Sequence, residues 1–176
     1  ASSTSQFWRV IYNSKERYND YPSDLNIDAQ NNIYITGMGE GNGTNRDYVT
    51  LKYDPSGSRQ WVARYNDVNT NYDHDEAKAI VTDNHGNVYV TGVSIRQYLG
   101  NGHYDYDFVT AKYSEFGTQQ WVSYFDSCVS TNYFAMSIVV DNYNSVYIMG
   151  DGNYGKCIIK YNSDGTKNWS IQDPGS

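Results

Sequence analysis

Apolar and polar residues alternate along most of this chain in short runs separated by turn-forming residues. The clearest runs are 77–83, 87–92 and 108–113, where β-branched and aromatic residues recur at about every second position. This alternation predicts strands with one face toward a core. The segments between runs, such as 83–87, are short and rich in Asp, Asn and Gly, which predicts tight turns. No stretch carries a convincing helical pattern.

One set of spacings occurs three times, which indicates internal repeats. An Asp is followed six residues later by Tyr and nine residues later by Gly. Further on, a Lys-Tyr pair is followed by Gly four residues after the Tyr and by Trp four residues after that Gly. The copies contain Asp28, Tyr34, Gly37, Lys52, Tyr53, Gly57 and Trp61; Asp83, Tyr89, Gly92, Lys112, Tyr113, Gly117 and Trp121; and Asp141, Tyr147, Gly150, Lys160, Tyr161, Gly165 and Trp169.

Each copy predicts four strands, over about 23–66, 77–126 and 135–172. The third strands, 48–53, 108–113 and 156–161, have Val49, Val109 and Cys157 at equivalent inward positions. A partial copy precedes them, because Trp8 and Tyr12 align with Trp61 and Tyr65. Residues 7–13 are therefore predicted to form one extra outer strand. Its expected assembly residues are Phe7, Trp8, Val10 and Tyr12.

Units of four antiparallel strands that recur every 48–60 residues are typical of propeller blades. We therefore predict an all-β fold in one domain, 1–176, with three full blades, one extra N-terminal outer strand and no significant helix. The phrase Asp-x-x-Gly-Asn-Val-Tyr-Val-Thr-Gly, then Lys-Tyr-x-x-x-Gly-x-x-x-Trp, resembles the bacterial β-propeller repeat called SBBP. The third copy departs from it, with Asn144-Ser145 in place of Gly-Asn and Gly155 where Asp47 and Asp107 stand. The resemblance implies a secreted or cell-surface propeller module, a class typically without an assigned activity.

Three blades do not close a comfortable ring, because propellers usually have four to eight. Both end faces of an open arc need a cover. Two chains can close a six-bladed ring, the chain can be a fragment of a longer propeller, or strand 7–13 can be donated to a neighbouring chain. The strand at 168–172 favours exchange, because Asp173 stands where an aromatic residue is expected.

Composition limits the class of partner. A net charge of −7 argues against nucleic acids and anionic membrane surfaces as partners. The sequence also lacks a run of 18 apolar residues, so membrane insertion by a helix is not expected. Nineteen Tyr and few charges favour an extracellular or cell-surface protein. Cys128 and Cys157 allow one disulfide, but the alignment of Cys157 with Val49 and Val109 favours a buried apolar thiol.

Candidate ligand-binding residues lie in the variable connections, which are expected on one rim of the propeller. Tyr, Asn and Asp in these loops suit carbohydrate, and the candidate contacts are Tyr72, Tyr98 and Tyr104. Carboxylates in the same loops suit Ca²⁺, but no ligand loop of fixed spacing is present, which favours solvated acidic loops over a metal site. The candidate ligands are Asp73, Asp75, Glu76, Asp105 and Asp107.

No catalytic set emerges. Asp28, Asp83 and Asp141 recur in every copy, so we interpret them as turn residues that accept backbone N–H groups. His74, His85 and His103 occupy unrelated positions and have no nucleophile beside them in the sequence. The favoured function is a non-enzymatic extracellular module that assembles with itself or with further blades. The alternatives are a carbohydrate-binding propeller and a fragment of a larger secreted propeller.

Overall fold

The computed structural model describes residues 9, 11–13, 20–40, 46–67, 74–125, 134–152 and 155–173. Within these ranges the chain forms strands and turns and no helix, so it has no helix suited to crossing a membrane. The first sheet contains β1 (Tyr21–Ile27), β2 (Ile33–Gly39), β3 (Asp47–Tyr53) and β4 (Arg59–Tyr65). The middle sheet contains β5 (Asp75–Thr82), β6 (Val88–Gly100), β7 (His103–Tyr113) and β8 (Gln119–Phe125). The last sheet contains β9 (Phe134–Val140), β10 (Val146–Gly152), β11 (Gly155–Tyr161) and β12 (Lys167–Asp173).

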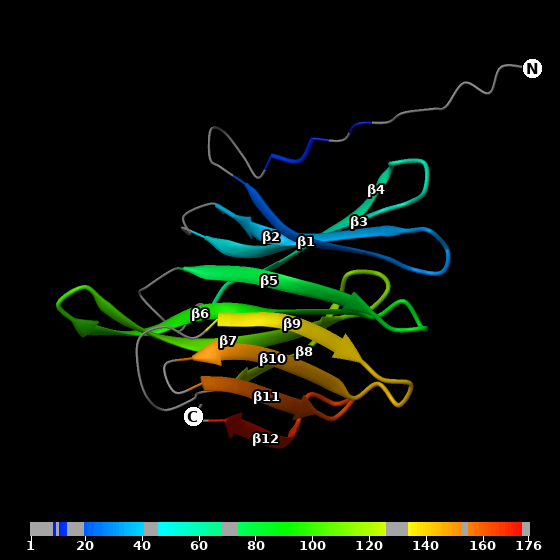
Figure 1. The fold of residues 1–176 in the computed structure, drawn as a ribbon. Coiled ribbons are helices and arrows are strands. Elements are labelled where there is room, and N and C mark those ends of the chain that lie inside the picture. The colour runs from blue at the N-terminus through cyan, green and yellow to red at the C-terminus, as the bar shows by residue number, and fades with distance from the viewer. Residues whose placement is uncertain are drawn as a thin grey trace, which may run out of the picture.

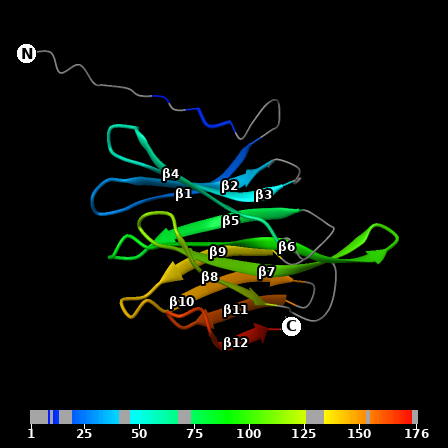
Figure 2. The same ribbon diagram turned by 180° about the vertical axis from the view of Figure 1, so that it is seen from behind.

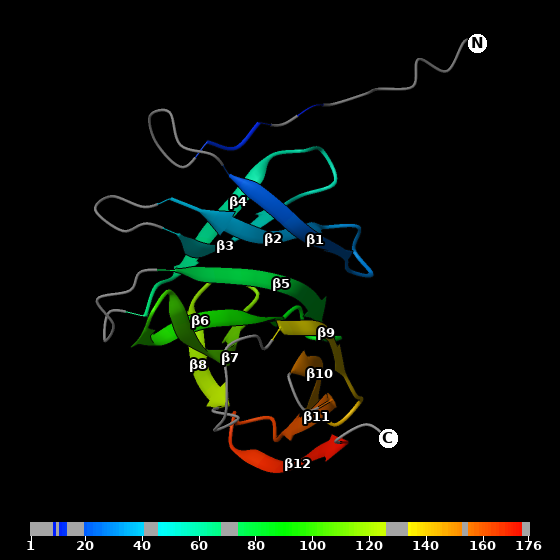
Figure 3. The ribbon, with the colours of Figure 1, turned by 60° about the vertical axis from the view of Figure 1, so that its left-hand side comes forward.

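Strands follow chain order in each sheet and pair antiparallel, which confirms the predicted fold class. The three sheets stack face on face (Figure 1), and their first strands β1, β5 and β9 lie next to one another (Figure 3). We call the side of each sheet that carries Tyr53, Tyr113 or Tyr161 its front face and the opposite side its back face. The back face of the first sheet packs on the front face of the middle sheet. The back face of the middle sheet packs on the front face of the last sheet.

The repeated Asp closes the turn between the first and second strands. Oδ1 of Asp83 accepts hydrogen bonds from the backbone N–H groups of His85 and Asn87, both at 2.9 Å, and Oδ2 accepts one from the Tyr89 hydroxyl at 3.0 Å. Equivalent bonds are made by Asp28 and Asp141. Burial alone raises the pKa of these carboxyls, but the hydrogen bonds outweigh it and hold each pKa below its usual value. The predicted structural role is confirmed.

The strands predicted over 87–92 and 108–113 are longer in the structure than the sequence pattern indicates. β6 and β7 continue through residues 94–106 as a long hairpin, with Tyr98 opposite Tyr104, and turn at residues 100–102, where φ is positive throughout. Two register shifts interrupt the period of two in this hairpin, which hid it from the sequence pattern.

The predicted N-terminal strand is described only in part. Arg9 and residues 11–13 belong to no strand, and residues 7, 8 and 10 lie outside the described ranges. An outer strand needs a third strand to pair with, and within the described ranges β1–β4 already pair with one another. The extra strand therefore remains a prediction.

Candidate functional site

Each stacked pair of sheets is joined by a tryptophan that lies against a glycine turn. Trp61 donates a hydrogen bond from Nε1 to the carbonyl of Glu115 at 2.9 Å, and Trp121 donates one to the carbonyl of Ser163 at 3.1 Å. A Cβ added at Gly117 would lie 2.8 Å from the Trp61 ring, and one at Gly165 would lie 2.7 Å from the Trp121 ring. Because these turn glycines also have positive φ, only glycine suits both the turn and the contact.

A tyrosine from the first sheet fills a socket in the front face of the middle sheet. The Tyr48 hydroxyl donates to the Val109 carbonyl at 3.3 Å and lies over Gly92, where an added Cβ would be 2.7 Å from it. Tyr65 packs edge-on against Tyr48, with ring centroids 5.2 Å apart. Burial, followed by the negative charge of Asp75, raises the pKa of Tyr48 well above its usual value. The socket therefore combines apolar walls with a carboxyl group whose charge acts on the occupant.

The back face of the last sheet has no described sheet against it. Its Trp169 keeps the contact with Tyr147 that each repeat makes, at 6.1 Å between centroids, but is 36% exposed. Met149, Ile158 and Ile171 are 44%, 40% and 56% exposed. All seven residues of β12 are exposed. An apolar sheet face of this kind usually marks an interaction surface.

The front face of the first sheet is covered in part by Tyr12, which packs against Val49, Leu51 and Tyr53. Arg64 donates a hydrogen bond to the Tyr12 hydroxyl at 3.0 Å. Between the middle and first sheets, the Tyr65 hydroxyl lies 3.0 Å from that of Tyr124.

The two contacts involve equivalent positions, because Tyr12 aligns with Tyr65 and Arg64 aligns with Tyr124. Tyr12 therefore lies against the first sheet as Tyr65 lies against the middle sheet. On the middle sheet, the equivalent place is taken by β4, the last strand of the first sheet.

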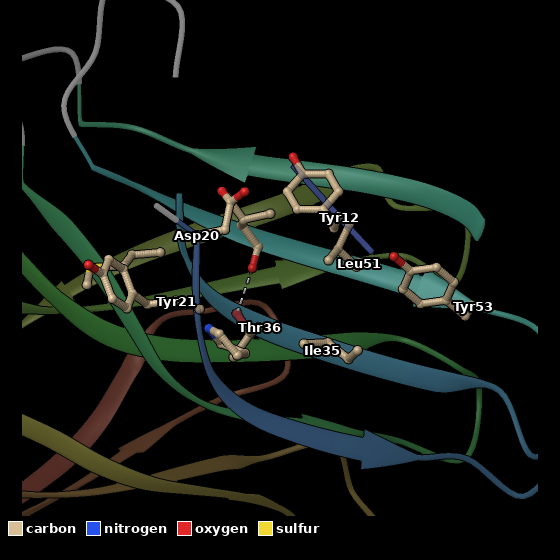
Figure 4. Close-up of a pocket in the computed structure, with 11 residues that line it drawn as sticks. Tyr12, Asp20, Tyr21, Ile35, Thr36, Leu51 and Tyr53 are labelled. Atoms are coloured by element: carbon tan, nitrogen blue, oxygen red, sulfur yellow. Dashed lines mark hydrogen bonds between the residues drawn. The ribbon is translucent and has the colours of Figure 1, made fainter. Parts of the chain in front are cut away.

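A cavity of about 240 Å³ opens beside Tyr12 (Figure 4). Its apolar walls come from β2 and β3, and include Ile35, Leu51 and Tyr53. The Asp20 side chain also lines it. The cavity is thus an apolar hollow bordered by a carboxyl group.

Two ion pairs meet at Arg96 on β6. Arg96 contacts Asp67 at 2.5 Å and Asp107 at 3.0 Å, and its guanidinium lies 5.0 Å from the centre of the Tyr124 ring. Asp75 accepts a hydrogen bond from the Asp67 backbone N–H at 3.0 Å. Burial raises the pKa of Asp75 to about 6.

The candidate calcium ligands do not converge within the described ranges, where no group of three or more His, Cys, Asp or Glu side chains is placed to hold a metal ion. Asp107 is paired with Arg96, and Glu76 is paired with Lys78. Asp105 lies on the β6–β7 hairpin, and Asp73 lies outside the described residues.

The candidate sugar-binding tyrosines are brought together only in part. Tyr98 and Tyr104 lie across the β6–β7 hairpin with ring centroids 5.1 Å apart, and Tyr98 is 38% exposed. This hairpin extends beyond the stacked sheets (Figure 2). Tyr72 lies outside the described residues.

Other predicted features are placed as follows. Cys157 is a free, buried thiol in the core between the middle and last sheets, as its alignment with Val49 predicts. Cys128 lies outside the described residues. The repeated lysines lie over the rings of the repeated tyrosines at 5.0–5.2 Å, so they support the sheets. These pairs are Lys52–Tyr34, Lys112–Tyr89 and Lys160–Tyr147.

The sequence reasoning missed the carboxyl group of Asp20 and the Arg96 ion pairs. Asp20 had a detectable signal, because it stands eight residues before the repeated Asp28, as Asp75 stands eight before Asp83. Arg96 had none, since no other repeat has a basic residue at an equivalent place in so long a hairpin.

Comparison with known proteins supports the same architecture. Residues 60–97 match the family described as Beta-propeller repeat, SBBP, which confirms the predicted resemblance over the segment from β4 to β6. No curated protein matches.

Among solved structures, a protein of unknown function from Bacteroides caccae, determined by crystallography at 1.35 Å resolution, is similar with a TM-score of 0.53 and 8% identity. The match covers 87% of this chain and 46% of that chain, so this chain spans about half its length. At this identity the likeness concerns the fold alone. On its sheets and on the segment 60–97, the chain is an all-β module of propeller-type blades that is similar to the SBBP repeat.

Proposed function

We propose that this propeller module is a non-enzymatic assembly protein whose copies join by exchange of an outer strand. The segment around Tyr12 of one copy pairs with β11 of the next copy and takes the place of β12. The observation that carries this proposal is the contact of Tyr12 with Arg64, which repeats the contact of Tyr65 with Tyr124. Because Tyr12 occupies the place of a last strand, the other strands of that blade have to come from elsewhere.

Two further features of the last sheet support exchange. β12 is exposed along its whole length, so its pairing with β11 is not reinforced by side-chain burial. Asp173 stands where Tyr65 and Phe125 are buried in the other repeats. Replacing β12 by a segment with Tyr12 at this place gives the composite blade the aromatic residue that β12 lacks.

We place this assembly outside the cell, on the low content of charged residues and the high content of Tyr. Fractionation of the producing cells tests the location: the proposal expects the chain in the medium or on the surface, and recovery from the cytoplasm alone contradicts it.

Sedimentation velocity of the full chain over a concentration series tests the assembly. We expect species larger than a monomer, and a Tyr12→Ala change should weaken association by about tenfold or more, because buried tyrosines dominate many interfaces. Tyr98→Ala is the matched control, since it removes a tyrosine from the distant β6–β7 hairpin. A monomer at all concentrations, or equal losses in the two variants, contradicts the proposal.

Carbohydrate binding is the second candidate, favoured by the tilted pair of Tyr98 and Tyr104. Partly exposed aromatic faces suit the apolar faces of sugars. A glycan array with the native chain and with the double change Tyr98→Ala and Tyr104→Ala tests it. Binding that the double change abolishes supports this function, and absence of binding by the native chain contradicts it.

A further inference from the structure

The cavity beside Tyr12 has the same walls as the socket that Tyr48 fills one sheet further on. The residues equivalent to its wall positions Ile35, Val49, Leu51 and Tyr53 are Val90, Val109, Ala111 and Tyr113, which pack with Tyr48 in one buried cluster. Tyr12 lies beside the cavity, as Tyr65 lies beside Tyr48. The cavity is therefore the place of a side chain from the third strand of another blade.

The two filled sockets show how the occupant is matched to its surroundings. In the middle sheet, Asp75 stands two residues before Ala77, which pairs with Gly92 under the polar tip of the occupant, Tyr48. In the last sheet, the occupant at the equivalent place is Phe108, and the sequence has the uncharged Tyr133 where Asp75 stands. In the sequence, an Asp at this position thus goes with the polar tip of Tyr48, and a Tyr at this position goes with the apolar ring of Phe108.

The open socket of the first sheet is bordered by Asp20, the equivalent of Asp75. In the last sheet the position equivalent to Tyr48 and Phe108 is Lys156, which is exposed on the back face. A lysine suits this socket, because its methylene stem can lie on the apolar walls while the ammonium group reaches the carboxylate. In register, Lys156 stands opposite Asp151 on β10 and Asp173 on β12. Removal of β12 takes away one of these carboxylates.

We propose that Lys156 of one copy inserts into the cavity beside Tyr12 of the next copy and pairs there with Asp20. This inference rests on the proposed assembly and names the contact that sets its direction and register. The back face of the last sheet then meets the front face of the first sheet, as the back and front faces already meet twice within the chain. An oppositely charged pair in a mostly apolar socket selects this register over a slipped one.

Charge reversal tests the pair in the full chain. Asp20→Lys alone and Lys156→Asp alone each place like charges at every contact between identical copies. We expect either change to weaken self-association by about thirtyfold or more, measured by sedimentation velocity. A mixture of the two variants restores opposite charges at every contact between unlike copies, so association should return in the mixture. Asp105→Lys, on the distant hairpin, is the control for the change in net charge and should associate as the native chain does.

The outcomes separate this inference from the assembly on which it rests. If both reversals leave association unchanged, or if the mixture associates no better than its components, the Lys156–Asp20 pair is wrong while assembly stands. If the native chain is a monomer throughout, both proposals fail. Near-ultraviolet circular dichroism of each variant identifies loss of fold. A variant that is unfolded is replaced by Asp20→Asn or Lys156→Gln, each of which should weaken association by about tenfold.

Discussion

The middle and last sheets carry the same repeated residues, yet they meet different surroundings. On the back face of the middle sheet, Thr91 and Thr110 lie 3.1 Å apart and are fully buried under the last sheet. On the back face of the last sheet, the equivalent positions hold Met149 and Ile158, which are exposed. The polar threonines are therefore buried and the apolar Met149 and Ile158 are exposed. In a domain that stands alone, apolar residues are more often buried than threonines. In the assembly that we propose, the first sheet of a second copy covers these exposed residues.

The tryptophans should give the largest difference in stability between the middle and last sheets. Trp121→Ala should lower the free energy of unfolding by about 3 kcal/mol, because it leaves a cavity where the ring packs on the last sheet. Trp169→Ala should lower it by about 1 kcal/mol, because no described sheet packs on that ring. Chemical unfolding at concentrations where the chain is a monomer measures both. Equal losses would show that a neighbouring sheet contributes nothing to the tryptophan contact.

A smaller difference in stability is expected between a turn glycine that contacts a tryptophan and one that does not. Gly117→Ala should cost about 2 kcal/mol, because the new Cβ meets both an unfavourable φ and the Trp61 ring. Gly102→Ala is the matched control, since its φ of 80° is similar and nothing lies within 4 Å of the added Cβ. We expect that control to cost about 1 kcal/mol. If the two changes lower the free energy of unfolding equally, the contact between Gly117 and the Trp61 ring does not add to the cost of the new Cβ.

The smallest expected effect concerns Asp75, beside the filled socket. Its pKa is about 6 in the folded chain against an ordinary 3.8. Its contribution to stability is therefore fully present below about pH 3.8 and is lost as the pH rises through about 6. Asp75→Asn should raise the free energy of unfolding at neutral pH by about 1 kcal/mol, and the difference from the native chain should vanish toward pH 4.

Unfolding of both chains over a pH series measures this difference. His74, whose pKa is lowered by burial, acts in the opposite direction and is common to both chains. A difference between the two chains that is constant with pH would contradict the burial of a charged Asp75.

Much of the fold followed from repetition. The spacing from Asp to Tyr predicted a turn closed by hydrogen bonds, and Asp83 with Tyr89 has that geometry. The strand pattern failed over 94–106, because register shifts remove the period of two. Pattern reasoning works where each strand keeps one face buried, and this hairpin leaves the sheet.

The candidate site was less accessible to sequence reasoning. The repeats identified Tyr12 as an equivalent of Tyr65, but its neighbour Arg64 became evident only from the packing of the two positions. The roles proposed for Asp20 and Lys156 depend on the cavity that Asp20 lines. Their positions could be aligned in the sequence, whereas an unfilled cavity could not be predicted from it.

The most direct test of strand exchange uses the native thiol of Cys157. In the three sheets, Arg64, Tyr124 and Gln172 pair with the positions equivalent to Cys157, so exchange places Ile11 of the neighbour opposite Cys157. Directly opposed residues on paired strands are close enough for a disulfide after small adjustments. Ile11→Cys is made in a chain that also carries Cys128→Ser and is oxidised at alkaline pH, because burial raises the pKa of the Cys157 thiol. The account predicts covalent dimers and longer species in which mass spectrometry finds residue 11 of one copy linked to Cys157 of another; monomers alone, or a link within one chain, would contradict it.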